Sequence, residues 1–198
     1  MDIAVVAWGS LIWCPGSLRN RTRWRRDGPR LPIEFARISK DGRLTLVIHP
    51  GCEDQPTYWA LSEFTSLDQA RRNLSERENA SFSDIHYLLR NGQAAETSPP
   101  EVIERMRDWL AQHTDLHTVL WTGLSSNWKK KRGRDFTPED AVRYLGELKA
   151  ARDQATTIYD RAREYVRNTP PNIQTAVRRA MLEQGWDDAR LPSLLFEN

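Results

Sequence analysis

The sequence predicts an α+β fold with a helical C-terminal region. Short apolar segments separated by turn residues fill the first third of the chain, and capped helical periodicities fill most of the rest. The 198 residues suffice for one domain, or for one domain with an extension. The 39% hydrophobic content, with eight tryptophans, can fill a sizeable core. We therefore expect an α+β core at residues 1–136 and a helical region at residues 137–198 that packs on the core or on a partner.

The predicted strands lie in the first third of the chain. Residues 3–8 form a continuous apolar run typical of a strand buried on both faces, and Gly9-Ser10 allows a sharp turn at its end. Asp41-Gly42 lies between two further apolar segments and predicts a β-hairpin. The Arg-rich residues 19–30 predict a surface loop. The three later strands are expected at residues 33–38, 44–49 and 57–61.

Two helices and another strand are expected in the middle of the chain. Ser66 and Gln69 form a capping-box pattern at the start of the first helix. The second helix is expected to begin at Ser98-Pro99-Pro100-Glu101. Ser98 is the expected cap, a proline occupies the first turn, and Glu101 is a side-chain acceptor three residues after the cap. Residues 117–121 return to a strand-like pattern rich in β-branched and aromatic side chains.

The remaining residues are predicted to be helical. Thr137-Pro138 opens a helical segment that continues to about Arg167, divided at Gly146 or near Ala150-Ala151. Pro170-Pro171 ends this segment and begins a last helix that stops at Gly185. The apolar stripe of the 137–167 segment has small residues and favours close packing against another helix or a second subunit. Its members are Ala141, Leu145, Leu148, Ala155, Tyr159, Ala162 and Val166.

Composition argues against several classes of protein. Two cysteines form no disulfide framework, and four scattered histidines give no metal-ligand pattern, so we expect no metal site. No apolar run approaches the roughly 18 to 20 residues needed to span a bilayer, and no signal peptide opens the chain. We therefore expect a cytoplasmic protein without a membrane association. The formal charge of +2 is small for a dedicated nucleic-acid coat.

Three segments contain residues that could bind a substrate or take part in a reaction. A strand that ends in Gly9-Ser10 leaves N–H groups free to bind an anion or a developing oxyanion, although a plain tight turn fits the same pattern. Glu78 ends the first helix, where the macrodipole is unfavourable to a carboxylate, and an apolar setting would raise its pKa and suit a proton shuttle. A solvated surface cluster is the alternative there. The third segment, residues 119–128, contains Trp121 and Asn127 and could line a pocket opposite the Gly-Ser turn, or form a core strand with a wet loop.

The opening residues Ala7-Trp8-Gly9-Ser10-Leu11-Ile12-Trp13 resemble the Tyr-Gly-Ser-Leu-Ile-Trp motif of the γ-glutamyl cyclotransferase family, and of its ChaC-like glutathione-degrading branch in particular. Further segments follow in the family's order, and the resemblance covers about residues 1–148. They are Thr57 to Leu61, Leu74-Ser75-Glu76-Arg77-Glu78, and Val119 to Asn127 with Glu139 downstream.

This resemblance implies a small mixed β-barrel with flanking helices and a cofactor-independent reaction. A γ-glutamyl group would be cyclised to 5-oxoproline with release of an amine, and Glu78 would be the general acid/base. The implied substrate-binding residues are Trp8, Gly9, Ser10 and Leu11, with Trp121 and Asn127 in the later segment. Trp8 replaces the family's tyrosine, and Asn79-Ala80-Ser81 replaces the Lys-Gly-Gly-Tyr of the glutathione-specific branch, so glutathione is not the expected substrate.

Other functions remain open on the sequence. Basic residues interleaved with Trp24 and Trp128 could contact the phosphates of a nucleic acid while the tryptophans stack on its bases. The same residues could instead belong to solvated loops, or could attract an anionic substrate. A non-catalytic subunit or homodimer could use the 137–167 stripe. A serine or cysteine hydrolase lacks a nucleophile motif around Ser10 or Cys14. The basic residues are Arg19, Arg21, Arg23, Arg25 and Arg26, and Lys129-Lys130-Lys131-Arg132-Gly133-Arg134.

Overall fold

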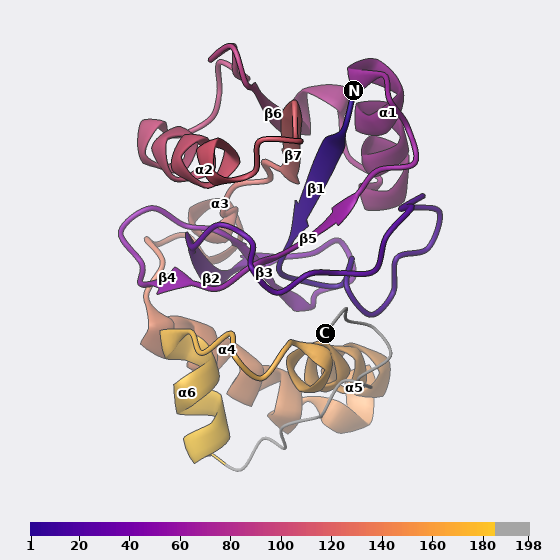
Figure 1. The fold of residues 1–198 in the computed structure, drawn as a ribbon. Coiled ribbons are helices and arrows are strands. Elements are labelled where there is room, and N and C mark those ends of the chain that lie inside the picture. Colours follow the sequence, from indigo (N-terminus) through magenta and orange to yellow (C-terminus); the bar gives the residue numbers. More distant parts are fainter. Residues whose placement is uncertain (185–198) are drawn as a thin grey trace. The chain divides into compact units, whose positions relative to one another are not determined.

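The computed structural model describes residues 1–184, apart from the side chains of residues 152–157. Strands and helices are mixed along these residues, which confirms the α+β class (Figure 1). The chain divides into two compact units. The first contains residues 1–31 and 56–124, and the second contains residues 32–55 and the described part of 125–191. The expected boundary between the core at residues 1–136 and the helical region at residues 137–198 stays a prediction.

The first unit contains a four-stranded sheet in the order β5-β1-β7-β6. Strand β1 (Ile3–Ala7) is central and has β5 (Tyr58–Leu61) antiparallel on one side and β7 (Thr118–Thr122) parallel on the other. Strand β6 (Ile85–Leu89) pairs antiparallel with β7. Each residue of β1 is at most 1% exposed, as its continuous apolar run predicts.

Helices α1 (Leu67–Glu78) and α2 (Pro100–Gln112) cover opposite faces of this sheet (Figure 1). Arg71 of α1 lies over the ring of Tyr87, 4.8 Å from its centroid. Trp109 of α2 packs edge-on against Trp59, with ring centroids 5.3 Å apart. Since neighbouring residues of a strand point to opposite faces, the pairing places Tyr87 and Trp59 on different sides of the sheet.

The second unit combines a three-stranded sheet with helices. The sheet order is β3-β2-β4, in which β2 (Leu31–Ile38) pairs antiparallel with β3 (Leu44–Ile48), and β4 (Asp54–Gln55) is short. Four helices follow in this unit. They are α3 (Trp128–Arg132), α4 (Pro138–Ala150), α5 (Arg152–Asn168) and α6 (Ala176–Glu183). The first unit also contains the short 3₁₀ helix η1 (Phe82–Asp84).

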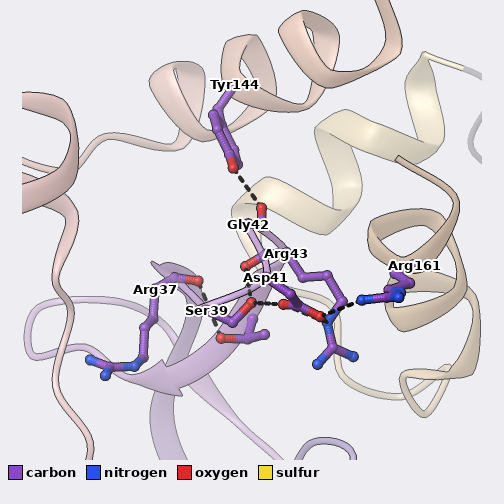
Figure 2. Close-up of polar contacts among 8 residues, drawn as sticks. Arg37, Ser39, Asp41, Gly42, Arg43, Tyr144 and Arg161 are labelled. Carbon is purple, nitrogen blue, oxygen red and sulfur yellow. Dashed lines mark hydrogen bonds and ion pairs between the residues drawn. The ribbon is translucent and has the colours of Figure 1, made fainter. Parts of the chain in front are cut away.

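The predicted hairpin at Asp41-Gly42 is confirmed and is fixed by helices of its own unit. Gly42 has φ of +82°, a conformation that favours glycine. Figure 2 shows the Tyr144 hydroxyl of α4 donating to the Gly42 carbonyl and Arg161 of α5 reaching the Asp41 carboxylate at 3.5 Å. Partial burial opposes ionisation of Asp41, but hydrogen bonds from Ser39 and Arg43 and the charge of Arg43 hold its pKa below the ordinary value. The tip of the hairpin is therefore held by charge and hydrogen bonding as well as by its turn.

Helix starts show which capping predictions were correct. Thr137 caps α4 as predicted, because its hydroxyl accepts from the N–H of Asp140 at 3.2 Å. Ser66 precedes α1 but makes no side-chain cap hydrogen bond, so the predicted capping box is wrong. Helix α2 begins at Pro100, and Ser98 instead lies 2.8 Å from Nδ1 of His86. The N-cap residue is Pro99, so Ser98 lies one position too early to cap the helix.

The long C-terminal helical segment divides at Ala151, at one of the two places expected. Most of its apolar stripe is buried within the chain itself: Ala141 and Leu145 of α4, and Ala162 and Val166 of α5, are at most 1% exposed. Helix α4 contacts both α5 and α6. Within the described side chains, therefore, the stripe gives little support for a dimer surface. The predicted stop at Gly185 lies outside the described residues.

Other elements were not predicted. The sequence predicts no strand at β4 or β6, and it predicts a loop at the residues of α3. Across residues 1–184, no helix combines the length and apolar character that crossing a membrane requires.

Glycine positions give a direct test of this packing. A Cβ added at Gly123 would lie 2.3 Å from the His86 ring, which is itself held by hydroxyls of Thr97 and Ser98. We expect Gly123→Ala to lower the free energy of unfolding by roughly 1–3 kcal/mol. A Cβ at Gly146 of α4 meets nothing within 4 Å, so Gly146→Ala should raise it by roughly 0.5–1 kcal/mol. Urea denaturation of both variants checks the pair, and equal effects would contradict the described packing.

Candidate functional site

A tight bend follows β1 and contains the predicted substrate-binding residues. The N–H of Ile12 donates to the carbonyl of Gly9 at 3.0 Å, and the N–H of Cys14 donates to that of Ser10 at 2.8 Å. Among the described residues, the N–H groups of Gly9, Ser10 and Leu11 donate to no acceptor. Gly9 and Ser10 are half-buried. Backbone N–H groups left over in such a turn can receive an anion or a developing oxyanion.

Glu78 is the last residue of α1. The chain turns immediately after it, since Asn79 has φ of +47° and the N–H of Ala80 donates to the carbonyl of Ser75 at 3.1 Å. The side chain of Glu78 is only 18% exposed. A largely buried carboxylate at the negative end of a helix requires a cationic partner, which its neighbour supplies.

Arg77 connects Glu78 to the bend. Its Nη1 donates to Oε1 of Glu78 at 3.1 Å, and its Nη2 donates to the hydroxyl of Ser10 at 3.1 Å. The same guanidinium donates to the carbonyls of Cys14 at 2.6 Å and Pro15 at 3.3 Å. The Arg77 side chain is only 12% exposed, and its bonds to Glu78 and Ser10 are part-buried. One guanidinium therefore holds the end of α1 against the bend after β1.

Burial raises the pKa of Glu78 above its ordinary value, and the charge of Arg77 counteracts only part of this rise. A carboxyl group with a raised pKa exchanges protons more readily near neutral pH than a solvated glutamate does. The arrangement therefore suits a general acid/base that Arg77 connects to the bend after β1.

Trp121 does not lie where a pocket shared with Glu78 and the bend would place it. Its side chain is fully buried, and its ring packs edge-on against His86 with centroids 5.9 Å apart. Strand alternation places it on the sheet face covered by α2, whereas α1 and Glu78 belong to the other face. Trp8 is also buried, at 6% exposure. The structure thus brings Glu78 together with Ser10 and the bend, but not with the indole of Trp121.

Asn127 belongs to the second unit, where its side chain completes hydrogen bonding along β2. Its Oδ1 accepts from the N–H of Ile38 at 2.9 Å, and its Nδ2 donates to the carbonyl of the same residue at 2.8 Å. Both polar groups of the amide are therefore occupied with backbone. This pairing gives Asn127 a structural role that the sequence analysis did not foresee.

The two basic segments present no exposed tryptophan. Trp24 is 5% exposed and Trp128 is 1% exposed, so neither ring can stack on a base without rearrangement. Several of the cations lie within 3.0 Å of a carboxylate. These pairs are Arg19–Glu63, Arg21–Asp2, Lys129–Asp135, Arg132–Glu147 and Arg134–Asp140. The observations favour the interpretation of both segments as balanced surface charge.

Arg77 is the residue of this site whose role the sequence analysis missed. In the sequence Arg77 stands out only as part of the segment Leu74-Ser75-Glu76-Arg77-Glu78. Its neighbours at Cys14 and Pro15 contribute carbonyl groups, which no residue pattern identifies. The sequence signal that could have identified this role is an arginine directly before a glutamate at the end of a helix.

Comparison of the chain with protein-family models, with curated proteins and with solved structures finds no match. The resemblance to the γ-glutamyl cyclotransferases therefore depends on the residues of the motifs themselves.

The raised pKa of Glu78 has a consequence for stability. A carboxyl whose pKa is higher in the folded than in the unfolded chain stabilises the fold fully below the unfolded pKa, and this contribution is lost as pH rises through the folded value. Glu78→Gln removes this dependence, so the variant should gain stability relative to the wild type, on the order of 1 kcal/mol, between acidic and neutral pH. Urea denaturation from pH 4 to pH 8 measures the difference. The exposed Glu76→Gln is the control, and a pH-independent difference for Glu78→Gln would contradict the described environment.

Proposed function

We propose that the chain is a γ-glutamyl cyclotransferase-like enzyme that forms 5-oxoproline from a γ-glutamyl group and releases an amine. The observation that supports this proposal is the contact of Arg77 with both Glu78 and Ser10, which sets a buried acid beside the Gly-Ser bend. Both features stand at positions that resemble the family's motifs. The finer fold type, a small mixed β-barrel with flanking helices, is part of the same proposal.

Glu78 would move the protons of the reaction. Its carboxylate takes a proton from the substrate's α-ammonium group, and the freed amine attacks the γ-carbonyl carbon to close the five-membered ring. The bond from that carbon to the leaving nitrogen then breaks, and this nitrogen receives the proton from Glu78. The ring nitrogen loses its second proton to the released amine, which leaves as an ammonium ion. The carboxylate is regenerated, so no cofactor is consumed. Proton transfer of this kind typically accelerates a reaction by about 10²–10⁴-fold.

The bend would stabilise the charge that develops during the attack. The carbonyl oxygen becomes an oxyanion when the ring closes, and the N–H groups of Gly9, Ser10 and Leu11 have no acceptor among the described residues. Arg77 fixes the Ser10 side of the bend and keeps Glu78 nearby. The donors and the acid/base are then held in place before the substrate arrives, which lowers the cost of reorganisation.

We expect Glu78→Gln to lower the rate of 5-oxoproline release by about 10²-fold or more, because glutamine has a similar shape but accepts no proton. The assay is a screen of γ-glutamyl amines, peptides and amides with 5-oxoproline as the readout, followed by kinetics on the best substrate. Glu76→Gln changes an exposed glutamate in the same helical turn and should keep full activity. Full activity of Glu78→Gln on a confirmed substrate would exclude Glu78 as the acid/base.

The partner of Glu78 gives an independent prediction. Arg77 lowers the pKa of Glu78, so Arg77→Gln should move the acidic limb of the kcat/KM profile to higher pH. We also expect a loss of about tenfold in kcat/KM, since the bend loses donors at Ser10 and Cys14. Arg77→Lys retains the charge and should shift the limb less. An unchanged limb in both variants would show that Arg77 does not act on the ionising group.

A further inference from the structure

The second unit contains a cavity of about 360 Å³, a volume within the range of small-ligand sites. Its lining comes from β2, from the turn that follows β3, from the segment that leads into α4, and from the first residue of α6. The apolar part of the lining consists of Ile33, Pro50, Phe136, Pro138 and Ala176. This site lies in a different unit from Glu78 and does not depend on the proposed enzymatic function.

A buried carboxylate lines this cavity. Glu34 lies within β2 and is 2% exposed. Its Oε1 accepts from the N–H of Phe35 at 2.7 Å, and its Oε2 accepts from the N–H of Val177 at 3.4 Å, near the start of α6. These bonds anchor α6 and explain why the carboxylate is fixed and buried beside the cavity.

The charges around the cavity favour a cation. Glu53 lines it and is paired with Arg179 at 3.1 Å, and none of the described lining residues is a lysine or an arginine. An anionic ligand would be buried near Glu34 without a compensating positive charge, which is costly. A cationic ligand would instead be attracted to the Glu34 carboxylate.

Two further lining residues, Cys52 and His49, supply polarisable groups. Sγ of Cys52 lies 3.6 Å from Nδ1 of His49, and the His49 ring packs against Phe136 with centroids 4.8 Å apart. Burial and the charge of Glu34 raise the pKa of the Cys52 thiol to about 11, so the thiol stays protonated at neutral pH. The effect on Cys52 shows that the field of Glu34 reaches the wall of the cavity. An aromatic ring beside this field can also attract a cation through its face.

We infer that the cavity binds a small organic ammonium compound with an aromatic or branched apolar body. The apolar residues accommodate the body, Phe136 offers an aromatic face, and Glu34 attracts the positive charge.

The test titrates the full ¹⁵N-labelled chain with benzyltrimethylammonium, whose charge does not depend on pH. Shifts should map to residues 49–55 and to Glu34, Phe136 and Ala176. Neutral benzyl alcohol should bind at least about tenfold more weakly, and benzoate should not bind at concentrations up to about 10 mM. Glu34→Gln should weaken binding of the cation at least about fivefold. Glu164→Gln, an exposed acid on α5 of the same unit, should leave it unchanged.

Glu34→Gln could disturb the anchoring of α6, so Phe136→Ala provides a second variant in a half-buried loop position. It removes the aromatic face and should weaken binding of the cation at least about threefold in a chain whose spectrum is otherwise unchanged. Equal affinity for benzyl alcohol, shifts that map elsewhere, or no binding of the cation up to about 10 mM would each overturn the inference.

Discussion

The guanidinium of Arg77 is the contact on which the candidate site depends. It donates to the carboxylate of Glu78 and to groups of the bend after β1, and so joins two segments that are distant in sequence. A carboxylate at the C-terminal end of a helix otherwise faces carbonyl dipoles of its own sign. The arginine makes burial of Glu78 tolerable without lowering its pKa to the ordinary value, which leaves the group able to exchange protons.

Glu34 and Glu78 lie at helix ends of opposite polarity and have different partners there. Glu34 meets the N-terminal end of α6, where Thr175 and backbone N–H groups donate to it, whereas Glu78 sits at the C-terminal end of α1 with Arg77 as its cation. Burial raises the pKa of both, but only Glu34 has backbone donors that favour its ionised form. Glu34 therefore anchors the start of α6, whereas the role that we propose for Glu78 is proton transfer.

The sequence predicted those elements whose signal is local. The apolar run of β1, the Asp41-Gly42 turn and the Thr137 cap are each determined by a few adjacent residues. Ser98 does not cap α2, and its hydroxyl is hydrogen-bonded to His86, twelve positions earlier in the chain. The face on which Trp121 lies depends on strand pairing, and the role of Glu34 depends on an N–H 143 positions away. Such long-range contacts leave no local pattern, so the position of Glu78 was predictable but its connection through Arg77 was not.

A crystal structure of the chain with 5-oxoproline bound would show whether the bend and Glu78 form one site. We expect an oxygen of the ligand within hydrogen-bonding distance of the N–H groups of Gly9, Ser10 or Leu11, and the ring nitrogen within reach of the Glu78 carboxylate. Arg77 should keep its bonds to both sides. A ligand bound away from the bend, or a Glu78 side chain turned into solvent in that complex, would contradict the account.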